Sequence, residues 1–229
     1  MVSLTISMED VTMRQYYTIP TNRHVAICGM TRSGKSFLCE QYLAKYDYVV
    51  KLDTKNETME RRRKNEPLWA DLKENVDFTV CTSFEDLDNI DTNKIIYVPS
   101  FEEQNEETYN KFFRWIYDRE NTIVWIDELM SIGTANSYPI ELKRLMIMGN
   151  SKNVACWCCT QRPSGIPNIV LANVTFIFVF NLNLPDDRKK LVQISGCTEI
   201  MEMPKGHNFW FYRMGDESAT KARLVPKGG

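Results

Sequence analysis

The eight residues from Gly29 to Ser36, GMTRSGKS, constrain this chain more than any other feature. They fit the pattern GxxxxGK[ST], in which two glycines let the backbone approach a phosphate group and adopt conformations that side chains disfavour. Residues 23–28 before them are apolar enough for a short strand, and residues 36–46 after them have apolar side chains at helical spacing. A strand, a glycine-rich turn and a helix in this order predict a nest of backbone amides that binds phosphate at a helix N-terminus.

Each part of this loop has an expected role in binding ATP and Mg²⁺. We expect Lys35 to reach the β- and γ-phosphates and Ser36 to ligate Mg²⁺. We expect Arg32 to touch a phosphate or to swing towards the catalytic carboxylate; the alternative is a solvated loop residue. The predicted nucleotide-binding residues are Gly29, Met30, Thr31, Arg32, Ser33, Gly34, Lys35, Ser36 and Phe37.

Residues 122–128, TIVWIDE, form an apolar run that ends in two carboxylates. Ligands of open α/β sheets bind at the carboxyl ends of the strands, so Asp127 is expected to hold Mg²⁺ there. The adjacent Glu128 is placed to polarise an attacking water, which favours ATP hydrolysis. The alternative is an ordinary exposed acidic pair at the end of a strand.

A second apolar run, residues 154–159, leads into Thr160-Gln161-Arg162-Pro163. Gln161 is expected to hydrogen-bond the γ-phosphate or the attacking water and so to sense hydrolysis. Arg162 is placed to face a neighbouring subunit. Taken alone, these four residues are weak evidence.

The rest of the chain alternates apolar strands with helices, which predicts an α/β fold with a mostly parallel central sheet covered by helices on both faces. This is the architecture of a RecA-like (ASCE) P-loop NTPase. We expect residues 1–22 to be an N-terminal extension and residues 23–229 to be a single ATPase domain with closing strands. Besides the segments above, the expected strands are 47–52, 76–82, 94–98, 175–180, 208–212 and 222–225, and the expected helical segments are 55–73, 84–89, 106–119, 139–148 and 186–194.

Bulk composition narrows the function further. The formal net charge of −2 offers no global basic field, so any DNA contact needs a local patch or a pore. The seven cysteines contain no CxxC pair, which argues against a zinc ribbon and favours buried thiols in a reducing compartment. No signal peptide opens the chain and no apolar run is long enough to span a bilayer, so we expect a soluble protein.

The order GxxxxGKS, strand-DE, strand-TQRP resembles the FtsK/HerA superfamily of DNA-translocating P-loop ATPases. The resemblance extends over residues 23–213 and includes ANVTFIFVFNLNLPDDRKKL and KGHNFWFY. Because the chain is close to a minimal ATPase, it is most similar to the genome-packaging ATPases of tailless, membrane-containing phages and related archaeal and large eukaryotic viruses.

This resemblance implies a motor that hydrolyses ATP and translocates double-stranded viral DNA into a preformed capsid. The implied assembly is a homo-oligomeric ring, a pentamer or hexamer, that contacts capsid vertex proteins and is virion-associated or in the host cytoplasm. A neighbouring subunit would supply an arginine to the γ-phosphate: Arg188 by its match to the family stretch, with Arg162 and Arg144 as weaker alternatives. Relatives often carry arginine where this chain has Asn150, with Lys152 nearby.

The segment 51–64 is a candidate DNA contact, because it holds six basic residues against three acidic ones. Arg61, Arg62, Arg63 and Lys64 form its densest part. In a ring, a few such residues per subunit would bind phosphates without sequence preference. The alternative is a solvated, charged helix.

Three other functions remain open from the sequence. One is a cellular or plasmid-borne DNA translocase of the same superfamily. Another is a virion assembly factor that uses nucleotide binding as a switch, although Glu128 and Gln161 argue for hydrolysis. The third is a small-molecule kinase, for which the sequence has no lid or acceptor-site signature.

Overall fold

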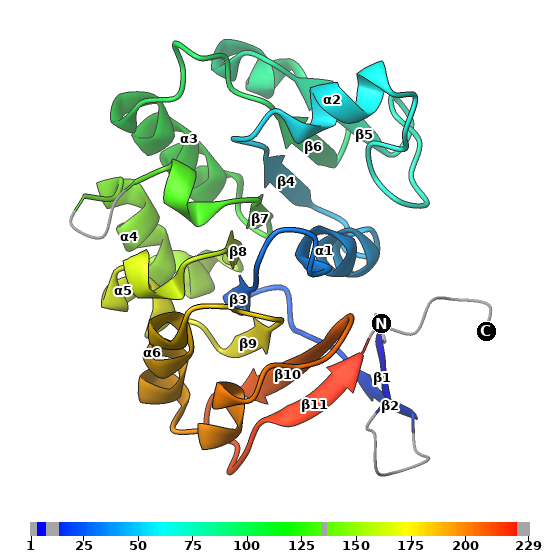
Figure 1. Ribbon diagram of the computed structural model, residues 1–229. Coiled ribbons are helices and arrows are strands. Elements are labelled where there is room, and N and C mark those ends of the chain that lie inside the picture. Colours follow the sequence, from blue (N-terminus) through cyan, green and yellow to red (C-terminus); the bar gives the residue numbers. More distant parts are fainter. Residues whose placement is uncertain (1–3, 8–13, 134–136, 224–229) are drawn as a thin grey trace.

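In the computed structural model, which describes residues 4–7, 14–133 and 137–223, the chain folds around a nine-stranded sheet (Figure 1). Seven neighbouring strands, from β9 through β3, β8, β7, β4 and β6 to β5, are parallel, and β10 and β11 add antiparallel strands at one edge. The predicted α/β class with a mostly parallel sheet is therefore confirmed. The strands are β3 (Val25–Cys28), β4 (Val49–Leu52), β5 (Phe78–Cys81), β6 (Lys94–Tyr97), β7 (Ile123–Ile126), β8 (Ala155–Thr160), β9 (Phe176–Val179), β10 (Asn208–Arg213) and β11 (Thr220–Arg223).

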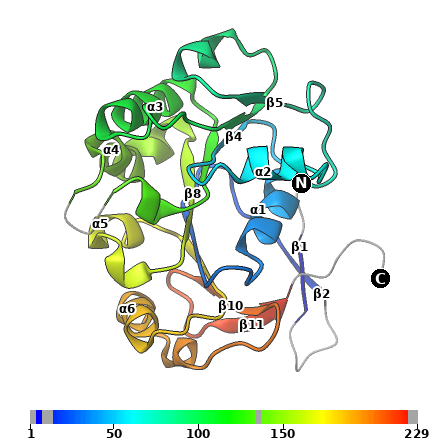
Figure 2. The same cartoon turned by 45° about the horizontal axis from the view of Figure 1, so that its top comes forward.

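Helices cover both faces of this sheet, as Figure 2 shows. One face carries α1 and α2, and the other carries α3, α4, α5 and α6. The α-helices are α1 (Lys35–Leu43), α2 (Glu57–Arg63), α3 (Glu106–Arg119), α4 (Ile140–Met148), α5 (Asn168–Leu171) and α6 (Pro185–Ser195). Short 3₁₀ helices span Phe84–Asn89, Leu129–Ser131, Gly149–Lys152, Pro163–Gly165 and Thr198–Met201.

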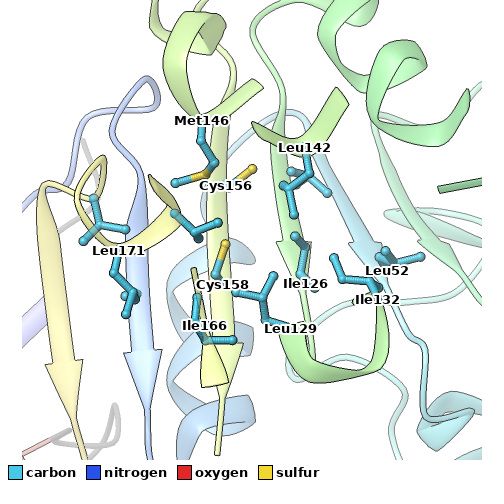
Figure 3. Packing of buried hydrophobic residues seen from close by; sticks show 14 of the residues in the cluster. Leu52, Ile126, Leu129, Ile132, Leu142, Met146, Cys156, Cys158, Ile166 and Leu171 are labelled. Atoms are coloured by element: carbon cyan, nitrogen blue, oxygen red, sulfur yellow. The ribbon is translucent and has the colours of Figure 1, made fainter. Parts of the chain in front are cut away.

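The central strands are buried on both sides, which explains why their sequences are continuously apolar rather than alternating. Leu142 and Met146 of α4 are directed at Ile126 of β7 and Cys156 of β8 (Figure 3). On the opposite face, α1 packs against a second apolar cluster that includes Trp157. The sheet therefore lies between two close-packed apolar clusters, which hold the carboxyl ends of its strands in fixed positions.

The segment 55–73 is helical over a shorter stretch than the sequence predicts. Helix α2 ends at Arg63, and Asn65 then adopts a left-handed conformation with φ of 54°. Beyond it, Trp69 is buried against the α1 face and donates its indole N–H to the Glu40 carbonyl at 3.1 Å. Burial of this large aromatic ring competes with continued helix and redirects the chain.

The first 22 residues contain a strand pair of their own. Strands β1 (Leu4–Ser7) and β2 (Arg14–Tyr17) pair antiparallel in a separate two-stranded sheet. The Tyr46 hydroxyl donates to the Ile19 carbonyl at 2.6 Å, which ties the end of this segment to the turn after α1. The boundary at residue 22 stays a prediction, and residues 224 and 225 of the last expected strand lie outside the described residues.

Two findings bear on the compositional predictions. All seven cysteines are free thiols and are buried. None of the helices in the described ranges has both the length and the apolar character needed to cross a membrane.

Candidate functional site

The segments that follow five neighbouring strands meet at the carboxyl edge of the sheet. Gly29 follows β3, Asp53 follows β4, Asp127 follows β7, Gln161 follows β8 and Asn181 lies just beyond β9. A pocket of about 650 Å³ lies beside them, and its walls include Thr31, Lys35, Ser36, Phe37, Lys55 and Gln161. The fold therefore gathers most of the residues that the sequence singles out, although Thr31 and Gln161, for example, are 130 positions apart in the chain.

The loop from Gly29 to Ser36 is held by backbone contacts from two strands. The Gly29 N–H donates to the Thr160 carbonyl at 3.0 Å, and the Met30 N–H donates to the Asn181 carbonyl at 2.8 Å. A Cβ atom on Gly29 would lie 2.7 Å from the Cβ of Phe180, so only glycine fits at this position of the loop.

Within this loop, Gly34 has a φ of 112°, which glycine adopts readily. Arg32 is exposed, lines the pocket and has a φ of 62°, a left-handed conformation that is unusual for arginine. The buried Lys35 ammonium donates to the Gly29 carbonyl at 2.6 Å and to the Met30 carbonyl at 2.9 Å. Burial is the main cause that lowers the pKa of Lys35.

Asp127 presents one carboxylate oxygen that the protein does not hydrogen-bond. Its Oδ1 accepts from the Thr54 N–H at 3.1 Å and from the Thr54 hydroxyl at 3.0 Å. Its Oδ2 is buried, has no hydrogen bond, and lies 3.5 Å from the Lys55 Nζ. Burial raises the pKa of this carboxyl to about 6, and Lys55 opposes the rise.

The donors at this edge fit a hard cation such as Mg²⁺. The Oδ2 of Asp127, which accepts no hydrogen bond, and the hydroxyl of Ser36 at the pocket wall are oxygen ligands of the kind that Mg²⁺ prefers. In the part of the chain that the structure describes, no three His, Cys, Asp or Glu side chains are grouped to hold a metal ion.

Glu128 is connected to the glycine-rich loop through Gln161. The Gln161 side-chain amide donates to Glu128 Oε2 at 3.0 Å, and Thr31 of the loop donates its hydroxyl to Gln161 Oε1 at 2.8 Å. The backbone N–H groups of Met130 and Gln161 also donate to Glu128 Oε1, each at 3.4 Å. A carboxylate, an amide and the glycine-rich loop thus form one chain of hydrogen bonds.

Solved structures share this arrangement of strands and helices, although no protein-family profile and no curated protein sequence matches the chain. The genome packaging NTPase B204 of Sulfolobus turreted icosahedral virus 2, in complex with AMPPCP, superposes with a TM-score of 0.69 at 15% identity. The match covers 90% of this chain and 100% of B204. The fold is that of a P-loop NTPase.

Two longer proteins have the same P-loop NTPase fold in part of their chains. The pCW3 conjugation coupling protein TcpA matches with a TM-score of 0.60 at 14% identity, over 99% of this chain and 67% of TcpA. EssC of Geobacillus thermodenitrificans (ATPases 2 and 3) matches with a TM-score of 0.64 at 12% identity, over 97% of this chain and 44% of EssC. These neighbours agree with the superfamily that the sequence motifs resemble.

The three arginines predicted to act on a neighbour lie outside the pocket walls of this P-loop NTPase fold. Arg188 of α6 is half-buried and donates to the Leu182 carbonyl in the loop after β9. Arg162 is exposed and its Nε donates to the buried Asp187 at 3.1 Å. Arg144 on α4 is exposed and pairs with Glu141 at 3.3 Å.

The basic segment on α2 is less positive than its arginine count indicates, because each of its three arginines has a carboxylate partner. Arg61 pairs with Glu40 at 2.6 Å and with Glu57 at 3.0 Å, Arg62 pairs with Glu74, and Arg63 pairs with Glu60 at 2.5 Å. Lys64 at the end of α2 is exposed. Arg61 also lines the pocket, so α2 borders the candidate site as well as the surface.

Three residues at the site escaped the sequence analysis. Phe180 packs beneath Gly29 and Gly34, and the His207 Nδ1 lies 3.4 Å from the Ser33 carbonyl. Both come from the far end of the chain and carry no local signal. Lys55 was grouped with the basic segment, although it lies only three residues past the end of the apolar strand β4, and nearness to the carboxyl end of a strand is a usable signal.

Proposed function

We propose that this chain is an ATPase that hydrolyses ATP with Mg²⁺ and drives double-stranded DNA into a viral capsid. The observation that carries the proposal is the continuous contact from Thr31 through Gln161 to Glu128. A protein that only bound nucleotide would not need a buried carboxylate aligned with its phosphate-binding loop. The nucleotide-switched assembly factor is therefore the less favoured reading.

The residues divide the chemistry among them. Lys35 and the loop amides would bind the β- and γ-phosphates, and Ser36 and Asp127 Oδ2 would hold Mg²⁺. When bound, Mg²⁺ neutralises charge that develops on the phosphate oxygens. Glu128 would take a proton from the attacking water, because its carboxylate is connected to the loop by hydrogen bonds through Gln161. Gln161 fixes the orientation of Glu128 and, through Thr31, links that orientation to the loop.

The DNA-motor part of the proposal rests on the neighbours and on the arginines. B204 is a genome packaging NTPase, and the match covers 100% of the B204 chain. None of Arg188, Arg162 and Arg144 lines the pocket of its own chain, which is compatible with a role at a neighbouring subunit's site. We propose a pentameric or hexameric ring that acts with capsid vertex proteins, in the virion or in the host cytoplasm. The likeness to TcpA keeps a conjugative translocase as the second candidate.

The hydrolytic claim is tested by binding and single-turnover measurements on the wild type and Glu128→Gln. The variant keeps the shape of the side chain and the possibility of a hydrogen bond to Gln161, so it should bind ATP as the wild type does. Its hydrolysis rate should fall by about 10² to 10⁴-fold, the usual contribution of a general base. Equal rates for the two proteins would remove Glu128 from the mechanism.

The ring claim is tested by mixing two inactive variants, Glu128→Gln and Arg188→Ala. A site on an Arg188→Ala subunit still has Glu128, and a Glu128→Gln neighbour still offers Arg188 to it. Mixing should therefore restore part of the activity if Arg188 acts in trans. An Arg188→Ala protein that is fully active by itself would move the role to Arg162 or Arg144.

A further inference from the structure

Lys55 stands at the candidate ATP site without a role in the proposed chemistry. It lies three residues past the end of β4, next to β7 in the sheet, and lines the same pocket as Lys35 and Ser36. Its side chain is 37% exposed, whereas that of its partner Asp127 is 1% exposed. The ammonium group therefore lies between a buried carboxylate and the open pocket.

The backbone that carries Lys55 is fixed on both sides. Asp53 accepts the N–H groups of Glu57 and Thr58 at the start of α2, at 3.1 and 2.6 Å. Thr54 is hydrogen-bonded to Asp127 through its N–H and its hydroxyl. The backbone at Lys55 is therefore held in place on both sides. The long, flexible side chain carries the ammonium group to the pocket wall.

The contacts of the Lys55 ammonium leave it able to bind something else. Its Nζ lies 3.5 Å from Asp127 Oδ2 and 3.5 Å from the Asp127 carbonyl, both at the limit of an interaction. An ammonium has three N–H donors, and two long contacts to one residue do not saturate them. The Lys35 ammonium, in contrast, donates to two carbonyls of the loop at 2.6 and 2.9 Å.

We propose that Lys55 is a second phosphate-binding lysine of this site, which contacts the terminal phosphate of ATP while Asp127 positions it. This inference rests on the proposed function and deepens it. Lys55 contacts Asp127, the residue before the proposed base Glu128, whereas Lys35 is the first residue of α1. In the proposed mechanism the reacting γ-phosphate lies beside Glu128, so the charge of Lys55 should act on the γ-phosphate more than on the β-phosphate. If Mg²⁺ takes Oδ2 of Asp127, the Asp127 carbonyl, 3.5 Å from the Lys55 Nζ, still holds the ammonium beside the pocket.

The test compares how tightly a triphosphate and a diphosphate bind, using titration calorimetry with Mg²⁺ and either a non-hydrolysable ATP analogue or ADP. Lys55→Met removes the charge and keeps the length of the side chain. It should weaken binding of the analogue by about tenfold or more, the effect of one charge-assisted hydrogen bond, and change ADP binding by less than about threefold. Lys55→Arg, which keeps the charge, should recover most of the difference.

Lys111→Met is the matched control, because Lys111 also pairs with a carboxylate, Glu107 at 2.7 Å, but lies on α3 away from this pocket. It should bind both nucleotides as the wild type does. Lys55→Gln provides a second charge-free variant if the methionine variant melts at a lower temperature.

The outcomes separate this inference from the proposed function. Equal loss of analogue and ADP affinity in the Lys55 variants would show a purely structural role and overturn the proposal, as would no change in either. If the wild type binds neither nucleotide, the proposed ATPase activity is overturned, and the proposed role of Lys55 is overturned with it.

Discussion

Replacing His24 by asparagine should remove a specific part of the pH dependence of folding. His24 is 5% exposed, at the start of β3, and its Nδ1 accepts the Cys156 N–H at 2.9 Å. Burial lowers the pKa of His24 from 6.5 to about 4, and a hydrogen bond to the Met146 backbone opposes this shift only in part. The folded protein therefore requires a neutral imidazole at this position.

The sign and size of the effect follow from this pKa. Between pH 6.5 and about 4, His24 is protonated in the unfolded chain but neutral in the folded protein. The free energy of unfolding therefore falls as the pH falls through that window. Each pH unit is worth about 1.4 kcal/mol. The interval between the two pKa values therefore corresponds to a loss of about 3 kcal/mol in the free energy of unfolding. Above neutral pH this loss does not occur, because His24 is neutral in both the folded and the unfolded chain.

His24→Asn separates titration from hydrogen bonding. The asparagine Oδ1 can stand where Nδ1 stands and accept the Cys156 N–H, but it does not titrate. Loss of the bond to Met146 should cost about 1 kcal/mol at every pH. Asp127, whose pKa burial raises to about 6, titrates in both proteins and cancels from their difference.

The assay is urea unfolding of the wild type and His24→Asn between about pH 7.5 and about pH 4.5. The wild type should be the more stable at the upper end and lose that advantage on acidification. A stability difference that stays constant over this range would refute the reasoning, because it would mean that folded His24 accepts a proton as readily as the unfolded chain.

Further predictions concern the loop, the DNA and the strain at the site. Gly29→Ala should weaken ATP binding by about tenfold or more in a calorimetric titration, because its Cβ would lie 2.7 Å from that of Phe180; unchanged affinity would mean that the loop shifts freely. Replacing Arg63 and Lys64 together by alanine should lower the salt dependence of DNA binding by about two phosphate contacts and leave ATP affinity unchanged. An unaltered slope would move the DNA contact elsewhere. Arg32→Gly should raise the free energy of unfolding, measured by urea denaturation, by up to about 1 kcal/mol, since glycine adopts a φ of 62° without strain. A destabilised variant would show that the arginine side chain makes a compensating contact.

Much of the fold follows from local patterns in the sequence. Continuous apolar strands such as β7 and β8 indicate parallel strands buried on both faces, and the glycine-rich loop fixes the strand and helix on either side of it. The order of the strands does not follow, because it depends on pairing between segments far apart in the chain. The end of α2 was also missed, since it depends on the burial of Trp69 against α1, which lies on the same face of the sheet.

The same division holds at the site. The loop, Asp127, Glu128 and Gln161 could be selected from the sequence because each follows an apolar strand. Their connection through Thr31 could not, because it requires β7 and β8 to be neighbours and the loop to lie above them.

Charge counting failed for a related reason. Lys51 was counted in the basic segment, but it is 1% exposed within β4 and lies over the Trp125 ring, 4.6 Å from its centroid. Arg61 and Arg62 are paired with Glu40 and Glu74, which come from other parts of the chain. A run of basic letters therefore overstated the positive surface that the folded chain presents.

The most direct test of the central claim is the ATPase rate of the wild type with and without double-stranded DNA, over a range of protein concentrations. A ring motor predicts a rate that DNA stimulates and that rises cooperatively with concentration as subunits complete one another's sites, with Glu128→Gln inactive throughout. A rate that ignores DNA and is the same per subunit at every concentration would contradict the account.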